Sequence, residues 1–426
     1  MQQAMPEDSR NKASNFFQKN PVLKIKEFRF FLLIRFTLIF ALNLQTTAVF
    51  YWVFHITGSK LALGFVGLAE VIPAVLCSLF SGYIVDKNEK RKMLLRCITG
   101  YIFIACGLFS LSTSLVEKSL TGTWQLNFIY LFVFAGGAIR AFLGPSMFSL
   151  VGLIVPRELY PNATGWSSMM WQIGAVLGPV VSGALIAAWK GSEASLFITI
   201  IFELSLLIPI SFIATKPIVL KSKEPVLKSI SEGLQFVFNT PVLLSALCLD
   251  MFSVLFGGAV ALLPVYQTEI LHVDERGFGL LRAAPGIGAL VTLGLLAFLP
   301  LKTNPGKKLL ACIAGFGLSI ICFGLSTNFI LSFFMLVLSG MFDAVSVVIR
   351  GTILQLVTPN EMRGRVSAVN TMFISSSNEL GDFESGVMAQ WLGTVRAVVV
   401  GGCLTLCVVT TAFFKAPQLK NFKYDD

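Results

Sequence analysis

Twelve long apolar stretches, separated by short polar segments, constrain the fold of this chain more than any other feature. Each can cross about 30 Å of hydrocarbon as a helix, which takes roughly 20 residues. Charged residues make up only 13% of the 426 residues, about half the fraction found in soluble proteins. The pattern predicts an all-α membrane protein with twelve transmembrane helices, and it excludes a soluble enzyme or a disulfide-stapled secreted domain. The predicted helices are Phe30–Phe54, Leu61–Val85, Met93–Thr113, Leu126–Val151, Ala163–Trp189, Ala194–Ala214, Val242–Gln267, Gly277–Leu299, Leu309–Ser326, Phe329–Val357, Arg365–Leu392 and Ala397–Phe414.

The distribution of the 33 lysines and arginines predicts the orientation of these helices. The polar segments on one side carry 23 of them, the other side carries five, and five lie within or at the ends of helices. Basic residues are retained on the cytoplasmic side of a membrane. We therefore expect a multi-pass protein of the cell (inner) membrane with both termini in the cytoplasm, and no nucleic-acid partner for the net charge of +10. The first 28 residues contain no apolar run of the kind found in a cleaved signal peptide.

The longest polar interruption divides the helices into two sets of six and predicts the domain organisation. We expect a cytoplasmic segment over 1–28, a six-helix bundle over 29–215, a cytoplasmic linker over 216–241, a second six-helix bundle over 242–414 and a tail over 415–426. Helices four and five match helices ten and eleven at an offset of 203 residues, and helix two matches helix eight at an offset of 212. This indicates a six-helix unit duplicated in parallel, and so two pseudo-symmetric bundles.

Charges of opposite sign occupy two pairs of repeat positions. Arg140 matches Asp343, and Glu70 matches Arg282. Because repeat positions lie at similar depths, these residues could pair across the interface between the bundles, directly or through substrate and water. The alternative is that each charge finds its partner within its own bundle.

The segment that follows the second helix carries a dense charge motif. It runs from Gly82 through Asp86 to Lys90 and Arg91, and it resembles the loop signature G-x-x-x-D-[RK]-x-G-[RK]-[RK] of the major facilitator superfamily. Glu89 stands where that signature has its second glycine. The resemblance implies a latch at the cytoplasmic gate, while the simpler interpretation is a solvated basic patch that sets the topology.

Two further motifs and one segment support the same resemblance. Helix five carries Gly174, Gly178, Pro179 and Gly183, similar to the G-x-x-x-G-P-x-x-G-G signature of exporters in that superfamily. Small residues at this spacing predict close packing of helix five on helix eight, and the proline predicts a bend. The surroundings of Arg140 resemble the intramembrane arginine motif of proton-coupled members. Residues 363–386 are most similar to the enterobactin-exporter-type subgroup. The resemblance implies alternating-access export of a small organic molecule, driven by proton entry.

Ionisable residues within the apolar helices are the main functional candidates, because each costs about 2.5–3.5 kcal/mol at the centre of a bilayer on insertion scales. The interiors of the predicted helices contain seven carboxyl groups but only four arginines, so at least three acids lack a one-to-one arginine partner. We expect those acids to be protonated, hydrogen-bonded, hydrated from a cavity or paired with a cationic substrate. The acids are Glu70, Glu203, Asp250, Asp343, Glu379, Asp382 and Glu384, and the arginines are Arg35, Arg140, Arg282 and Arg350.

Asp250 and Asp343 are the leading candidates for proton coupling, since helices one, four, seven and ten line the central cavity in the superfamily that the chain resembles. Arg35 lies near the repeat position of Asp250 and could pair with it; the alternative for Asp250 is a locked structural contact. Glu379 and Asp382 share a helical face, where a network with Arg282 or Arg140 is expected. A structural gate and direct proton transfer are equal interpretations of that face, and Glu70 is a further coupling candidate. For Glu203, on an outer helix, we expect a self-contained hydrogen bond.

The polar residues Asn43, Gln45 and Gln172 complete the predicted cavity, with aromatic side chains at Phe36, Phe40, Trp171 and Phe252. The eight cysteines have no ligand-like spacing and only two histidines occur, so we expect no metal and no cofactor. The predicted function is secondary active export of small, siderophore- or drug-like organic molecules by a monomer that exchanges them for protons. Alternatives of the same fold are a lipid or lysolipid flippase and a solute importer. A membrane-embedded enzyme is not expected, and a non-transporting sensor would show no proton counterflow.

Overall fold

The apolar stretches form long helices because a backbone within hydrocarbon must satisfy its own hydrogen-bonding groups. The computed structural model describes residues 20–113, 121–217, 226–298, 304–359 and 362–423, and the regular elements in this part of the chain are all helical. The predicted N-terminal segment, linker and tail lie partly outside the described residues. Short helical turns occupy Pro21–Lys24, Arg157–Leu159 and Pro417–Lys420 (α18).

The twelve predicted membrane helices are present and fall into two halves. The N-terminal half contains α2 (Lys26–Thr57), α3 (Lys60–Lys87), α4 (Lys90–Ser112), α6 (Gly122–Ile154), α7 (Tyr160–Trp189) and α8 (Glu193–Ser205), the last extended by α9 (Leu207–Ser211). The C-terminal half contains α11 (Pro241–Gly257), α13 (Glu275–Phe298), α14 (Pro305–Leu325), α15 (Phe329–Val357), α16 (Arg363–Leu392) and α17 (Thr394–Lys415). Among the described residues, eleven spans are long and apolar enough to cross a membrane. The helix α16 has the length but carries too many charged and polar residues to meet that criterion.

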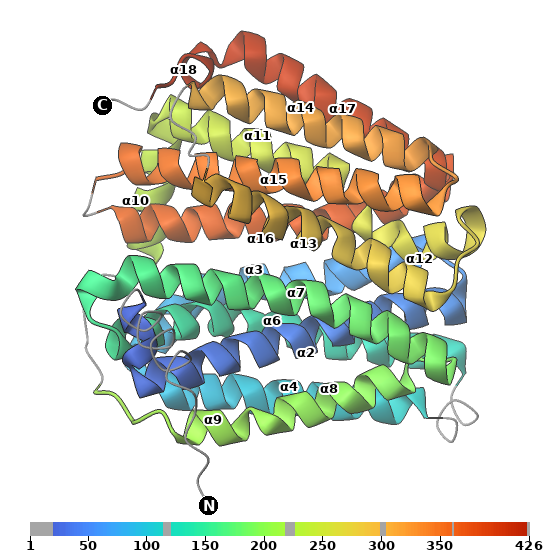
Figure 1. Ribbon diagram of the computed structural model, residues 1–426, viewed down its shortest axis with the longest axis horizontal. Coiled ribbons are helices and arrows are strands. Elements are labelled where there is room, and N and C mark those ends of the chain that lie inside the picture. Colours follow the sequence, from blue (N-terminus) through green and yellow to red (C-terminus); the bar gives the residue numbers. More distant parts are fainter. Residues whose placement is uncertain (1–19, 114–120, 218–225, 299–303, 360–361, 424–426) are drawn as a thin grey trace, which may run out of the picture.

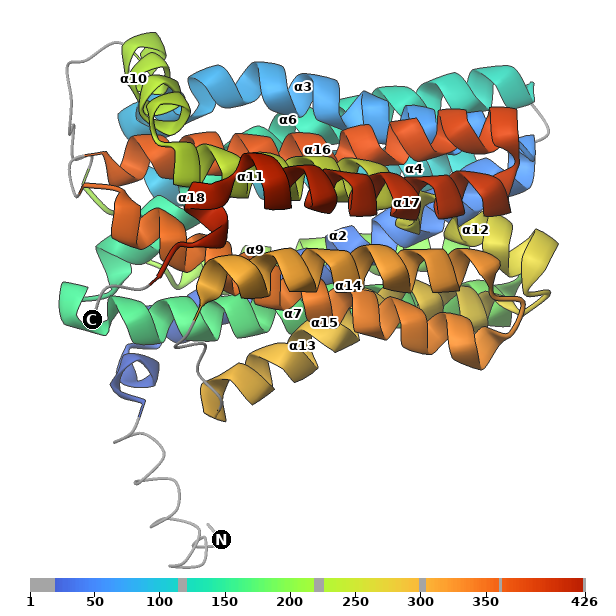
Figure 2. The same ribbon diagram turned by 90° about the horizontal axis from the view of Figure 1, so that it is seen from above.

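The two halves lie side by side with their helices roughly parallel (Figure 1). The main contacts between the halves are made by α3 with α16 and by α7 with α13. Figure 2 shows these two pairs on opposite sides of the molecule. We call the end at which α2 begins and α17 ends the termini end, and the opposite end the far end.

Helix seven was predicted to be continuous over Val242–Gln267, and this was wrong. It breaks after α11 at Gly257–Gly258 and continues as η3 (Val260–Leu262), α12 (Leu263–Val265) and the π-helical turn η4 (Tyr266–Ile270). Two consecutive glycines weaken a helix, and Pro264 provides no N–H for the turn before it. The Ser385 hydroxyl of α16 donates to the carbonyl of Gly258, so a side chain satisfies a backbone group that the break exposes.

Helix six and the linker also differ from the prediction. Helix six divides into α8 and α9 because Pro209 cannot donate to the carbonyl one turn earlier. The predicted linker contains a helix, α10 (Val226–Asn239), which packs on α11 and α16 through buried Val237. The sequence analysis did not predict α10, because its apolar residues are interrupted by polar ones and it is only 14 residues long, shorter than a membrane helix.

Candidate functional site

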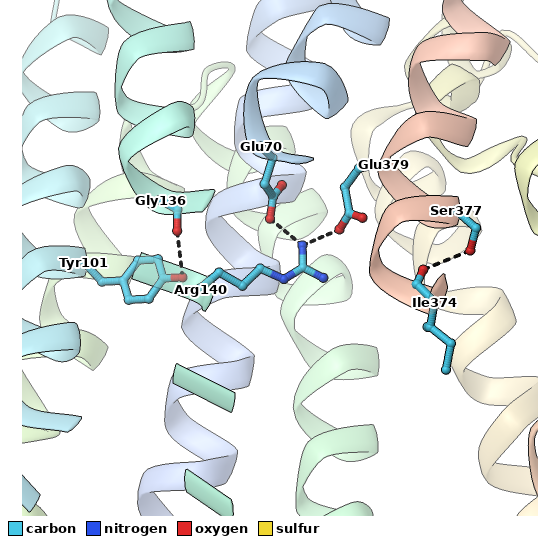
Figure 3. A network of polar contacts seen from close by, with 7 residues as sticks. All are labelled: Glu70, Tyr101, Gly136, Arg140, Ile374, Ser377 and Glu379. Carbon is cyan, nitrogen blue, oxygen red and sulfur yellow. Dashed lines mark hydrogen bonds and ion pairs between the residues drawn. The ribbon is translucent and has the colours of Figure 1, made fainter. Parts of the chain in front are cut away.

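Three charged side chains from three helices meet between the halves (Figure 3). Arg140 lies near the middle of α6, Glu70 is on α3 and Glu379 is on α16. Nη1 of Arg140 donates to Oε1 of Glu70 at 2.6 Å and also to Oε1 of Glu379. Because α16 belongs to the C-terminal half, this triad links the two halves.

Glycines at the helix crossings bring these three helices together. A Cβ added at Gly137 of α6 would lie 2.2 Å from the backbone oxygen of Glu70. A Cβ added at Gly67 of α3 would lie 2.8 Å from Cβ of Asp382 on α16. Small residues are what permit such close helix contacts within a membrane. Both α6 and α16 therefore approach α3 near the turn that carries Glu70.

Arg282 of α13 and Asp382 of α16 extend the triad. The Arg282 guanidinium lies over the Phe50 ring, 4.6 Å from its centroid. It interacts electrostatically with Asp382 and Glu70, and Asp382 interacts in turn with the triad. We call the five charged residues the central charge cluster: Glu70, Arg140, Arg282, Glu379 and Asp382.

The central charge cluster has an excess of carboxyl groups over guanidinium groups, and two of its polar atoms make no hydrogen bond in the described part of the chain. It contains three carboxyl groups and two guanidinium groups, so one proton would make it neutral. Oε2 of Glu379 and Nη1 of Arg282 are buried and make no hydrogen bond in the described part of the chain. Buried polar atoms without partners are uncommon and costly. The cluster is therefore equipped to bind a proton, or a polar group of a ligand, within the membrane.

All five cluster residues were candidates from the sequence, but a direct pair of Arg140 with Asp343, one of the alternatives for these repeat positions, is not found among the described residues. Arg140 instead binds Glu70 of its own half and Glu379 of the other. The reason is helix packing: Gly340, the repeat counterpart of Gly137, holds α15 against α13, where an added Cβ would lie 1.9 Å from the Pro285 carbonyl oxygen. Each repeat helix is thus fixed to a neighbour in its own half, away from its counterpart.

Asp250 lies in a separate ion pair within the C-terminal half. Its Oδ2 is 2.5 Å from Nη1 of Arg350, and both side chains are about 5% exposed. Asp343 interacts electrostatically with this pair and makes no ion pair of its own among the described residues. The expected partner Arg35 is not at Asp250, and its Nε is buried without an acceptor. A buried pair of this kind matches the locked contact that was the alternative for Asp250.

The predicted polar cavity residues have three different environments. Gln172 Nε2 donates to the carbonyl of Gly286 at 3.0 Å and so links α7 to α13 across the halves. Asn43 Nδ2 donates within its own helix to Ile39 at 2.9 Å. Oε1 of Gln45 is buried without a donor. Among the predicted aromatic residues, Phe40 is buried against Phe36, whereas Trp171 and Phe252 are exposed.

Among the described residues, Asp86 and Arg91 of the charged loop motif make no ion pair with the C-terminal half. Asp86 is 62% exposed and lies 3.6 Å from Lys90 of the next helix, and Arg91 donates to the Ser211 carbonyl of its own half. The departure at Glu89 has a structural role, since its carboxylate caps α4 by accepting from the backbone N–H groups of Arg91 and Lys92. An added Cβ at Gly82 would meet nothing within 4 Å.

The helix-five motif packs closely on helix eight (α13), as expected, and also on α2. Cβ atoms added at Gly174 and Gly178 would contact α2, and one at Gly183 would lie 2.5 Å from the Glu275 carbonyl oxygen and 2.8 Å from Cα of Gly279, on α13. Nine helical residues turn through about 900°, which places Gly174 and Gly183 on opposite faces. The carbonyl of Pro179 lies on the α13 side, against Gly279.

Two further buried residues in the N-terminal half are Glu203, which differs from the expectation, and Tyr101, which the sequence did not single out. Glu203 of α8 is fully buried, and neither carboxylate oxygen has a hydrogen-bond partner within the described ranges, so the predicted self-contained bond is absent. Tyr101 of α4 donates to the Gly136 carbonyl at 3.2 Å, next to Arg140 (Figure 3). The only sequence signal for Tyr101 was a hydroxyl group within an apolar helix.

Glycine contacts pack the two halves tightly together at the far end. At the far end, an added Cβ at Gly386 of α16 would lie 2.8 Å from Cα of Gly64 on α3, and Gly183 meets Gly279 similarly. Toward the termini end, an added Cβ at Gly144 of α6 would meet nothing within 4 Å. The Arg140 side chain is 41% accessible although it lies midway along α6.

Comparisons with known proteins agree with this architecture. A sequence model of the Major Facilitator Superfamily matches residues 31–382. The chain is 25% identical over 409 residues to proteins named enterobactin exporter EntS from Citrobacter koseri and from Escherichia coli K12, with 93% of each chain covered. Its fold is similar to a D-xylose–proton symporter (TM-score 0.72, 13% identity, covering 96% of this chain and 100% of that one). It is also similar to a bacterial homologue of the human lysosomal transporter Spinster (TM-score 0.68, 16% identity, covering 92% and 98%).

Proposed function

The chain belongs to the major facilitator superfamily, and we propose that it exports small organic molecules across the cell membrane in exchange for protons. The observation that carries this proposal is the triad of Glu70, Arg140 and Glu379, which joins the two halves by charge at the middle of the bundle. A coupling site needs a group that exchanges protons and whose partners change when the halves move. A carboxylate paired across the interface has both properties.

The orientation assigned by the basic residues makes the termini end cytoplasmic. The tightly packed far end then faces outward, and the structure is the state that is open toward the cytoplasm. We infer that the accessible part of the Arg140 side chain, 41% of its surface, faces that side. In this state the central charge cluster can release a proton to the cytoplasm and a substrate can enter.

Movement of the halves would change the partner of Glu379. Opening the far end separates α16 from α3 and α6, so Glu379 leaves Arg140 and binds a proton from the outer solution. Closing the far end returns Glu379 to Arg140, which competes with that proton and displaces it toward the cytoplasm. One proton enters in each cycle, and the substrate leaves during the outward-open phase.

The energy of one proton is sufficient for useful export. Entry of one charge down about 100 mV supplies near 2.3 kcal/mol. This sustains a gradient of roughly 50-fold for a neutral substrate, since 1.36 kcal/mol corresponds to a factor of ten. The relatives that carry the name enterobactin exporter favour a siderophore-like substrate for this chain and the outward direction.

The test is transport by the full chain in sealed proteoliposomes with an imposed pH gradient, across a panel of siderophores, drugs and lipids. Wild type should move a substrate against the proton flow, and Glu379→Gln should abolish that coupling. Glu384→Gln is the matched control, because Glu384 lies on the same helix and has no electrostatic partner in the cluster. Normal pH coupling in Glu379→Gln would contradict the assignment of the coupling site. Substrate movement with the protons would instead indicate an importer.

A further inference from the structure

A cavity lies at the far end, separate from the central charge cluster. Its volume is about 330 Å³, within the range of small-molecule sites. Both halves line it: the end of α2, the π-helical turn η4 and the start of α13. The lining residues are Tyr51, Phe54, His55, Gln267, Thr268, Glu269 and Glu275.

Unusual backbone builds one wall of this cavity. Three of its residues belong to the π-helical turn η4, which closes through a bond from the Leu271 N–H to the Tyr266 carbonyl at 2.8 Å. His272, two residues after the end of η4, has φ of +49°, a left-handed conformation that is uncommon outside glycine. Single π-helical turns and strained residues occur frequently at functional sites.

The polar groups of the cavity include more acceptors than donors. Oε1 of Gln267 is buried and accepts no hydrogen bond, although its Nε2 donates to the Val273 carbonyl at 3.0 Å. Glu275 accepts from the Tyr51 hydroxyl at 3.3 Å and has no ion-pair partner in the described part of the chain. Glu269 is already neutralised by Lys60, whose Nζ lies 3.0 Å from its Oε2. The Glu275 carboxylate thus remains without a cation partner in the described part of the chain.

Aromatic faces complete the recognition surface. The rings of Tyr51 and His55 stack with centroids 5.7 Å apart, and Phe54 lies beside them in the lining. Aromatic faces beside an uncompensated carboxylate attract organic ammonium groups more than they attract anions or neutral molecules.

We propose that this cavity is a binding site for a small organic ammonium cation at the far end of the protein. Since both halves line it, a ligand there binds the far-end-closed state in preference to the open one and shifts the population toward closure. The site is thus distinct from the central charge cluster, and its occupancy opposes opening at the far end.

The test is a ligand-observed NMR titration of the full-length protein in detergent with choline, against its neutral isostere 3,3-dimethylbutan-1-ol. Choline should bind at least about tenfold more tightly than the isostere, and Glu275→Gln should weaken choline binding at least about tenfold. Thr268→Asp adds a carboxylate at an exposed position of the lining, so it should tighten choline binding, a gain that misfolding cannot produce. Glu193→Gln, an exposed carboxylate at the same end, should leave the affinity unchanged.

Two outcomes would overturn this site. The first is equal binding of choline and its isostere, or choline affinities in Glu275→Gln and Thr268→Asp that match wild type. The second is choline binding that is lost in Asp343→Asn instead, which would place the cation within the central part of the C-terminal half.

Discussion

Replacing Gly183 by alanine should open the far end of the molecule. The added Cβ would lie 2.5 Å from the Glu275 carbonyl oxygen and 2.8 Å from Cα of Gly279, about 1 Å inside ordinary contact distance. Both obstacles are backbone atoms, so no side-chain rotation relieves them, and α7 and α13 must separate. Overpacking of this kind costs about 1–3 kcal/mol. The far-end-closed state should therefore lose roughly 5- to 150-fold in population relative to the open state.

The separation can be measured by electron–electron resonance between spin labels at exposed far-end positions, Glu193 of the N-terminal half and Arg276 of the C-terminal half, after replacement of the native cysteines. Wild type should show mainly the short distance, and Gly183→Ala should populate a longer one. Gly294→Ala is the control, because an added Cβ there meets nothing within 4 Å. An unchanged distance distribution in Gly183→Ala, or an equal change in the control, would refute the conclusion that glycine contacts hold the far end closed.

Three further substitutions test the charges and the cap. Arg140→Gln leaves the carboxylates of Glu70 and Glu379 unpaired and should lower the thermal midpoint of unfolding in detergent. The double variant with Glu379→Gln should recover part of that loss, and no recovery would argue against the pair between the halves. Asp250→Asn leaves Arg350 buried without its partner and should cost about 3–5 kcal/mol by the same measurement, and an unchanged midpoint would mean that the pair is not formed. Glu89→Ala removes the cap of α4 and should cost only about 1 kcal/mol in denaturant unfolding, so a loss as large as that of Asp250→Asn would point to a further role for Glu89.

The candidate residues could be recognised one at a time, but their partners could not. Glu70, Arg140, Arg282, Glu379 and Asp382 stood out because ionisable groups are rare and costly within apolar helices. Their grouping depends on contacts between residues as far apart in the chain as Arg140 and Glu379, which are 239 positions apart. Repeat symmetry alone did not identify the partners of Arg140, because symmetry matches depth along the bundle but does not specify which helices touch.

The twelve helices and their duplication follow from the sequence alone, because hydrophobic length and the obligation to satisfy the backbone within hydrocarbon are local properties of each segment. The grouping of the charge cluster and the tight far end were decided by tertiary structure. Both depend on which helix faces each glycine: Gly67 lies against Asp382, and Gly183 lies against Gly279. A glycine in the sequence indicates that a close approach is possible, but only the packed helices determine what approaches it.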